Sequence, residues 1–434
     1  MPSVPRSSLH RPRVRLATAA VVGVLVAGQS TIVAQAQTGV DMDARRCIVT
    51  PASSPAGFKP WQLDRLGIRD LWKMKDAQGR PLDGTGVSIA VIDTGVSNVN
   101  TAYFDTRNVT TLNYMPPDEN AEKDGLDCDH GTAVTALIVA KPDSDPRTNF
   151  SGVAPGAKVV AMRTLMASEP KDGVPQGNPA HIVAAIDDAI ARKVQIINIS
   201  QSMPRGTADY EKAIQRALDA GIVVVAAAGN VDDQVPARVR GPLYPANYPG
   251  VVSVGNTTPD DQPSPGSYSH PNQHVTIAAP GTLVMSLLPS APGDDDDTQA
   301  YAQLSGTSFA APLVTGVVAL MLQKEPGLTP AQVKQRLMET ADPPTRTLPD
   351  PQVGNGVLNP MRALTGVMVD ASQAPRPTPS YTPVVETPPP TPDPTPTRVA
   401  IGAAVGAGVL AVVGLVLRIV LPAAGRRGFR AADR

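Results

Sequence analysis

Four polar residues have side chains that could take part in acyl-transfer chemistry. Asp93, His130 and Ser308 each stand beside an apolar run, and Asn230 ends the small-residue segment AAAGN. A helix that begins near Ser308 would favour negative charge developing at its N-terminus, and the amide of Asn230 could donate to an oxyanion. These residue types are therefore candidates for a shared catalytic site.

Each of these residues has a simpler interpretation when it is taken alone. Asp93 could cap a loop, His130 could be a buried structural histidine, and Ser308 could be a helix N-cap. Asp93 also begins DTG, the motif of aspartic proteases, but that chemistry needs two carboxylates that share a proton. The chain has no second DTG or DSG. A buried histidine accounts neither for the Gly-Thr after His130 nor for its position after a polar loop.

The pattern between residues 61 and 364 predicts a scaffold that could bring these residues together. Apolar runs of strand length alternate with amphipathic helical patterns, which indicates parallel strands joined by crossover helices. Most runs lack polar alternation, as expected when both faces of a sheet are covered. We therefore expect an α/β fold with a mostly parallel central sheet and helices on both faces. Asp93 would lie at the carboxyl edge of this sheet, where such folds place their sites.

Particular segments carry this prediction. The predicted strands are 87–92, 159–162, 194–199, 222–227 and 251–254, and the clearest helices are 181–191 and 210–220. Another helix is predicted after Thr329, which forms a capping box with Gln332.

Four motifs of this region resemble those of the subtilisin family and follow the same order. They are IDTG at 92–95, HGT at 130–132, AGN at 228–230 and GTS at 306–308. The resemblance implies a subtilisin-like three-layer fold and a serine endopeptidase. We assign no cofactor and no metal ligand among the candidate site residues. In that family's mechanism Ser308 would attack the scissile carbonyl, His130 would act as general base and then acid, and Asp93 would orient the imidazole. Asn230 would donate to the oxyanion together with the backbone N–H of Ser308.

The segment INISQS at 197–202 resembles the edge strand against which subtilisins lay their substrate. The resemblance implies that Ser200, Gln201 and Ser202 contact a protein or peptide substrate. Ser202 stands where the family usually has glycine, so we expect an altered primary specificity pocket.

The N-terminus and the segment after residue 370 predict export and a membrane anchor. Residues 1–36 combine four arginines, an apolar run and a small-x-small site, which is typical of a signal peptide, and a retained signal anchor is the alternative. Residues 371–398 are rich in Pro and Thr and predict an extended stalk. A helix over residues 399–421 would reach roughly 34 Å at ~1.5 Å per residue, enough to cross the hydrocarbon.

The basic tail at residues 422–434 predicts the orientation in the membrane. Arg426, Arg427 and Arg430 follow the predicted span, so the positive-inside rule places this tail in the cytoplasm and the protease domain outside the cell membrane. Gly402 and Gly406 form one GxxxG, which either marks a helix-packing face or arises by chance in a Gly/Ala-rich span. The formal net charge of -1 gives no indication of nucleic-acid binding.

The chain has two cysteines, Cys47 and Cys128. In an exported protein an oxidised pair is the economical inference. The alternative is a metal site built from Cys128 and His130, although two neighbouring ligands are weak evidence for one. The acidic run at 294–297 could hold calcium, but a solvated loop is the simpler interpretation.

The order of segments resembles the mycosins, the membrane-bound subtilases of type VII secretion. The matching layout is a signal peptide, a short extension at 37–60, a protease domain at 61–370, a stalk, one membrane span and a basic tail. Cys128 resembles the mycosin cysteine that ties the extension beside the active site. The resemblance implies a type VII secretion membrane complex as partner. The alternatives are a structural component of that complex with secondary catalysis, and a general surface subtilase.

Overall fold

A computed structural model describes most of the chain before residue 367. The chain divides into two compact units, residues 1–368 and 369–434, and nearly all of the described residues belong to the first. The described residues are 39–50, 59–116, 125–142, 148–166, 178–230, 241–264, 274–290, 300–344, 347–366 and residue 414.

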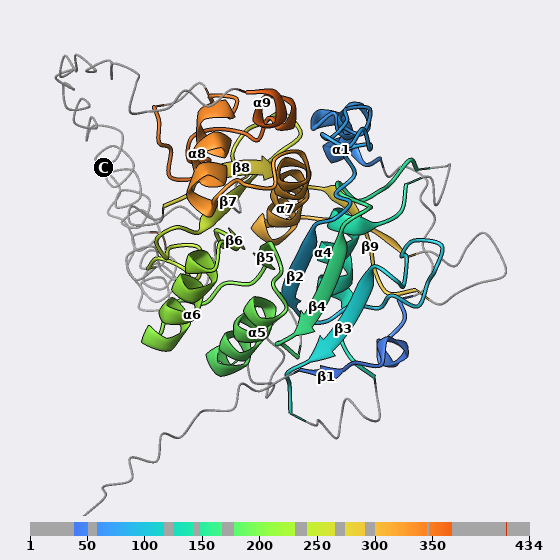
Figure 1. Cartoon of the computed structure of the whole chain (residues 1–434). Coiled ribbons are helices and arrows are strands. Elements are labelled where there is room, and N and C mark those ends of the chain that lie inside the picture. Colours follow the sequence, from blue (N-terminus) through green and yellow to red (C-terminus); the bar gives the residue numbers. More distant parts are fainter. Residues whose placement is uncertain are drawn as a thin grey trace, which may run out of the picture. The chain divides into compact units, whose positions relative to one another are not determined.

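The first unit is built on an eight-stranded sheet with the order β1-β3-β4-β2-β5-β6-β7-β8 (Figure 1). Every neighbouring pair is parallel except β1 and β3 at one edge. The strands are β1 (Val40–Asp41), β2 (Ser88–Asp93), β3 (Val109–Asn113), β4 (Lys158–Arg163), β5 (Ile196–Ile199), β6 (Val223–Ala227), β7 (Val252–Thr257) and β8 (Ile277–Pro280). All five predicted strands are present. The sequence patterns did not reveal β1, β3 or β8.

Helices cover both faces of this sheet, which confirms the predicted three-layer fold. Side chains of β2 alternate between two cores: Ile89 and Val91 pack with α4 (Asp129–Val139) and α7 (Thr307–Lys324). Ala90 and Ile92 pack with α5 (Pro179–Ala191) and α6 (Ala208–Asp219) on the other face. Both faces are buried, which explains why the strands are continuous apolar runs in the sequence.

The remaining helices are short or peripheral. The predicted capping box is present at the start of α8 (Pro330–Thr340), where Thr329 and Gln332 bond each other's backbone N–H groups. The others are α1 (Trp61–Arg65), α2 (Ile68–Leu71), α9 (Pro360–Thr365) and the short η1 (Ala44–Arg46). A separate antiparallel pair, β9 (Val284–Leu287) and β10 (Tyr301–Leu304), lies beyond the main sheet.

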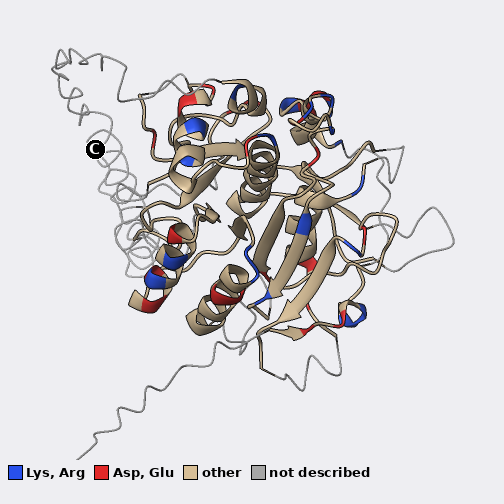
Figure 2. Cartoon of the chain, viewed as in Figure 1, with Lys and Arg blue, Asp and Glu red and all other residues tan. Residues whose placement is uncertain are grey.

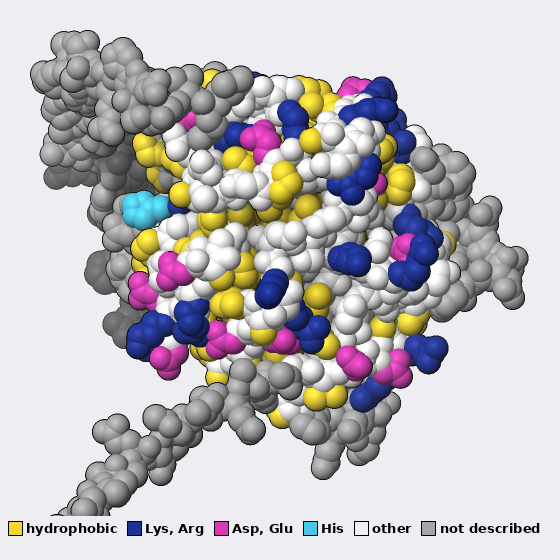
Figure 3. Space-filling view, in the orientation of Figure 1, with side chains coloured by type: hydrophobic (Ala, Val, Ile, Leu, Met, Phe, Trp, Pro, Cys, Tyr) yellow, Lys and Arg dark blue, Asp and Glu magenta, His cyan; other side chains and the backbone are white. Residues whose placement is uncertain are grey.

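Most of the charged residues belong to helices and loops rather than to the central strands (Figure 2). Arg216 of α6 pairs with Asp187 of α5 at 2.6 Å. On the face shown in Figure 3, Lys and Arg are interspersed with Asp and Glu rather than gathered in one patch.

One described helix, α7, is long and apolar enough to cross a membrane. However, 89% of it is buried inside the unit, so it is the central helix of a core. The predicted signal peptide, stalk, membrane span and basic tail, and the acidic run at 294–297, lie outside the described residues, with the exception of Gly414.

Candidate active site

Asp93 and His130 meet at the carboxyl edge of the sheet. Asp93 ends β2, near the centre of the sheet, and is only 1% exposed. Its Oδ1 accepts a hydrogen bond from the backbone N–H of Thr94 at 2.7 Å and lies 2.8 Å from His130 Nδ1. His130 is the second residue of α4. The carboxylate therefore holds one nitrogen of the imidazole.

Small and hydroxyl residues bring α4 against the turn that follows β2. A Cβ on Gly131 would lie 2.0 Å from the carbonyl oxygen of Gly95, so the contact requires glycine. The N–H of Gly131 donates to Thr94 Oγ1 at 3.0 Å, and the N–H of Ser97 donates to Thr132 Oγ1 at 3.0 Å. The Gly-Thr after His130 thus has a local function: it locks the histidine's helix onto the aspartate's turn.

Ser308 shares a cavity with His130. It is the second residue of α7 and is partly exposed, while Gly306 is the N-cap, so the N-cap interpretation of Ser308 is wrong. The cavity measures about 900 Å³, and its lining includes His130, Asn230 and Ser308. Phe309 also lines it, and its ring lies 5.2 Å from the imidazole between centroids. Because Ser308 is the second residue of α7, its hydroxyl lies at the N-terminal, positive end of the helix dipole.

Thr307 determines how the amide of Asn230 is oriented. The backbone N–H of Thr307 donates to Asn230 Oδ1 at 3.0 Å, and its hydroxyl lies 3.3 Å from the same atom. That hydroxyl also accepts from the N–H of Gly229 at 3.0 Å. Because Thr307 engages the side-chain oxygen of Asn230, the Nδ2 group of Asn230 can donate a hydrogen bond to a bound molecule. Sequence patterns assign Thr307 no role beyond its place in the GTS motif.

Ser200, Gln201 and Ser202 line the same cavity. They follow β5, which lies between β2 and β6, so the expectation of an edge strand here is wrong. Gln201 Nε2 donates to Thr164 Oγ1 at 3.1 Å, and Ser200 Oγ accepts from the side chain of Asn198 at 3.0 Å. Ser202 lies beside Gly229, with its Oγ 3.4 Å from the position of a Cβ there. The Ser202 hydroxyl therefore occupies space next to Gly229, the residue before Asn230.

The other described histidines, His181 and His274, do not line this cavity. His181 is in α5, and burial lowers the pKa of its imidazole. His274 lines a different hollow with Lys334 and Asn355. Of the histidines that the structure describes, His130 is the one that contacts the Asp93 carboxylate.

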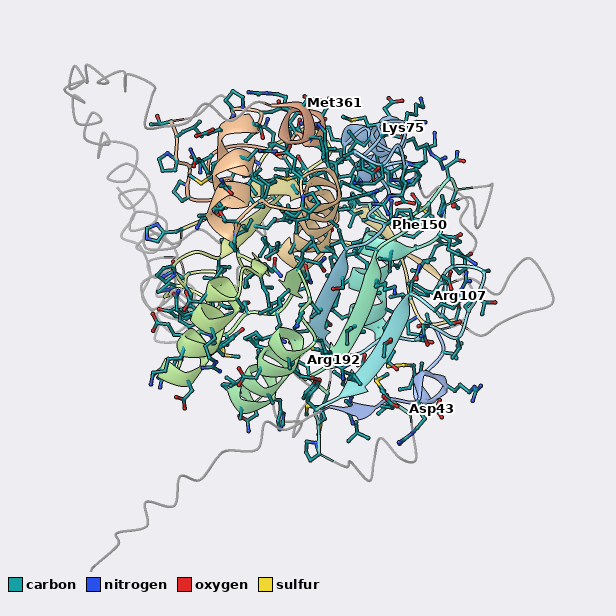
Figure 4. The ribbon with its side chains drawn as sticks, viewed as in Figure 1. Asp43, Lys75, Arg107, Phe150, Arg192 and Met361 are labelled. Atoms are coloured by element: carbon teal, nitrogen blue, oxygen red, sulfur yellow. A yellow bond between two sulfur atoms is a disulfide. The ribbon has the colours of Figure 1, made fainter. Side chains whose placement is uncertain are left out.

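Cys47 and Cys128 form a disulfide, as predicted, with Cα atoms 5.6 Å apart. The bridge lies near Asp43 in Figure 4. It excludes the alternative metal site because the Cys128 sulfur is already bonded, and the described residues contain no cluster of three metal-ligating side chains. Leu126 exchanges backbone hydrogen bonds with Arg46 and Ile48, so the extension runs along the loop that enters α4.

The fold and the arrangement at the carboxyl edge of the sheet define an α/β protein with an Asp-His pair whose histidine lines the same cavity as a serine. The model of the subtilase family matches residues 84–356, a region that includes all four motifs, and the chain belongs to this family. Subtilisin E of Bacillus subtilis (strain 168) is 33% identical over 258 residues, 59% of this chain and 61% of its own length. Subtilisin DY of Bacillus licheniformis is 33% identical over 272 residues, 62% of this chain and 89% of its own.

Three solved structures are similar over a longer stretch. MycP1 from Mycobacterium smegmatis is 29% identical with a TM-score of 0.56 and covers 78% of this chain and 93% of its own. The MycP3 protease from the type VII (ESX-3) secretion system is 29% identical with a TM-score of 0.56, at 74% and 92% coverage. A chain of an intact ESX-5 inner membrane complex is 28% identical with a TM-score of 0.57, at 88% and 100% coverage.

Proposed function

We propose that this protein is a serine endopeptidase with the triad Asp93, His130 and Ser308. Ser308 Oγ attacks the scissile carbonyl of a peptide. His130 takes the hydroxyl proton and passes it to the leaving amine, while Asp93 holds the imidazole and stabilises its charged form. The Nδ2 group of Asn230 and the backbone N–H of Ser308 donate to the oxyanion.

One observation carries this proposal: Asp93 Oδ1 lies 2.8 Å from Nδ1 of His130, and His130 lines the same cavity as Ser308 and Asn230. The contact uses Nδ1, so the Nε2 atom of the same ring is the one that can accept the serine proton. Asn230 supports the assignment because Thr307 holds its oxygen and its amide nitrogen can face the substrate.

Ser308→Ala tests the nucleophile. The variant should lose both peptide hydrolysis and covalent labelling by a fluorophosphonate, because no other group in the proposal can form the acyl-enzyme. Ser253→Ala is a matched control, since Ser253 is a buried serine of β7 outside the cavity. Labelling that persists in Ser308→Ala would contradict the triad.

We further propose that the protein acts at a membrane, anchored by residues 399–421 with the protease domain outside the cell, and that it associates with a type VII secretion complex. Support comes from the ESX-5 complex chain, whose match covers 88% of this chain, against 78% for MycP1 from Mycobacterium smegmatis. The order of the predicted stalk, span and basic tail fits this placement. The substrate would then be a protein that is exported nearby.

A further inference from the structure

A buried arginine lies on the strand next to that of Asp93. Arg163 ends β4 and is paired in register with Asp93 on the neighbouring strand β2. It is almost completely buried, with only 3% of the residue exposed. A buried guanidinium needs acceptors for its fixed fork of N–H groups, and the acceptors that it uses show which parts of the site it connects.

The guanidinium donates to backbone carbonyls from both catalytic segments. Its Nη1 donates to the oxygen of Thr94 at 2.8 Å and to the oxygen of Asp127 at 3.1 Å. Thr94 follows Asp93 in the chain, and Asp127 belongs to the loop that leads into α4 and His130. A single nitrogen therefore links the turn of the aspartate to the entry of the histidine helix.

The N-terminal extension covers this link. Met42 is 8% exposed, and its Sδ lies 2.9 Å from the position that a Cβ on Gly95 would take. The Cβ of Arg163 lies 3.3 Å from the same position. Met42 and Arg163 thus each pack against the turn that follows Asp93. The carbonyl of Thr94, a residue that is fully buried, cannot easily find another donor if the guanidinium is removed.

We propose that Arg163 is a positioning residue that sets the distance between Asp93 and His130. The two side chains come from different elements, so their hydrogen bond depends on how the turn after β2 and the entry of α4 are held relative to each other. The bond from Gly131 to Thr94 Oγ1 fixes one side of this junction, and Arg163 fixes the other. This inference rests on the proposed protease function, because it acts through Asp93 and His130.

Arg163→Met and Arg163→Lys test the inference in the full-length protein extracted from membranes. Methionine keeps most of the length without donors, and lysine keeps the charge as a compact ammonium that cannot reproduce the rigid fork. Arg163→Met should lower kcat by roughly 10², the scale expected when a catalytic group is misplaced by about 1 Å, with little change in KM. Arg163→Lys should recover part of the loss.

Arg336→Met is the matched control. Arg336 is 5% exposed and pairs with Glu325 at 2.7 Å, but it belongs to α8 outside the cavity. It should lower the melting temperature and leave kcat unchanged. If Arg163→Met does not fold, Arg163→Lys decides: a kcat equal to wild type in a folded Arg163→Lys would overturn the proposal.

A double-mutant cycle separates positioning from a general loss of structure. In an Asp93→Ala background the contact that Arg163 supports is already gone, so Arg163→Met should cause little further loss of kcat. Losses that multiply would show that Arg163 does not act through Asp93 and would overturn the inference. A wild-type protein without peptidase activity would instead refute the proposed function, and the inference with it.

Discussion

The backbone N–H of Thr307 bonds Asn230 Oδ1, and this contact gives the asparagine its proposed role. A side-chain amide can present either its oxygen or its nitrogen, and only the nitrogen can stabilise an oxyanion. Because Thr307 adjoins Ser308, the nucleophile and the oxyanion donor are fixed by neighbouring residues of one helix terminus. Displacing either group should therefore reduce transition-state stabilisation more than substrate binding.

Asn230→Ala tests this role at the scale of one residue. We expect kcat to fall by roughly 10² to 10³ with little change in KM, the usual loss for one oxyanion donor. Steady-state kinetics on a small peptide substrate would measure both constants. A change confined to KM would assign Asn230 to substrate binding instead.

At the scale of elements, the disulfide joins the extension to the start of α4. Cys128 is the N-cap of that helix, and the bridge joins residues separated by 81 positions. β1 also pairs with the strand β3, and the N–H of Thr50 donates to the oxygen of Pro289. The extension is therefore attached at several points along its course, and the covalent link lies two residues before His130.

Replacing both cysteines by serine should destabilise the protein without removing the triad. The chain-entropy model gives roughly 4 to 5 kcal/mol for a loop of this length, before any strain. Denaturant unfolding of wild type and of the double variant would measure the change in the free energy of unfolding. Thiol titration of denatured, non-reduced wild type should find no free thiols, and two free thiols would contradict the bridge.

At the scale of the whole molecule, the proposed anchor separates the protease domain from a short tail. A protease added outside intact cells or spheroplasts should digest the globular domain and spare the tail at 422–434, because the positive-inside rule retains basic residues in the cytoplasm. Epitope tags on either side of the span would report which part is cleaved. Digestion of the tail alone would reverse the proposed topology.

Docking to a secretion complex should not depend on hydrolysis, because catalysis uses a few atoms around Ser308, whereas association would involve the span and outer surfaces. Ser308→Ala should therefore leave the detergent-extracted complex intact. Replacing residues 399–421 with an unrelated span should weaken association while preserving cleavage of a small peptide. The size and composition of the extracted complex are the measurements. A protein that migrates alone in every case, with the secretion system present, would refute the docking.

The sequence by itself determined the alternation of strands and helices, the capping box of α8 and the identities of the chemical groups. These features depend on residues close together in the chain, so local patterns reveal them. Asp93 could be placed at a strand end because its own strand is a continuous apolar run. The four ordered motifs then indicated the family through residue identity alone.

Only the tertiary structure decided which groups orient the catalytic side chains. Thr307 and Asn230 are 77 residues apart, and Arg163 and Thr94 are 69 apart. In each case one partner is a backbone atom, which has the same chemistry in every sequence and leaves no motif. The central place of β5 was likewise missed because a buried apolar strand has the same pattern at many positions of a covered sheet. Contacts between distant segments depend on strand order and helix packing, and those are set by the fold as a whole.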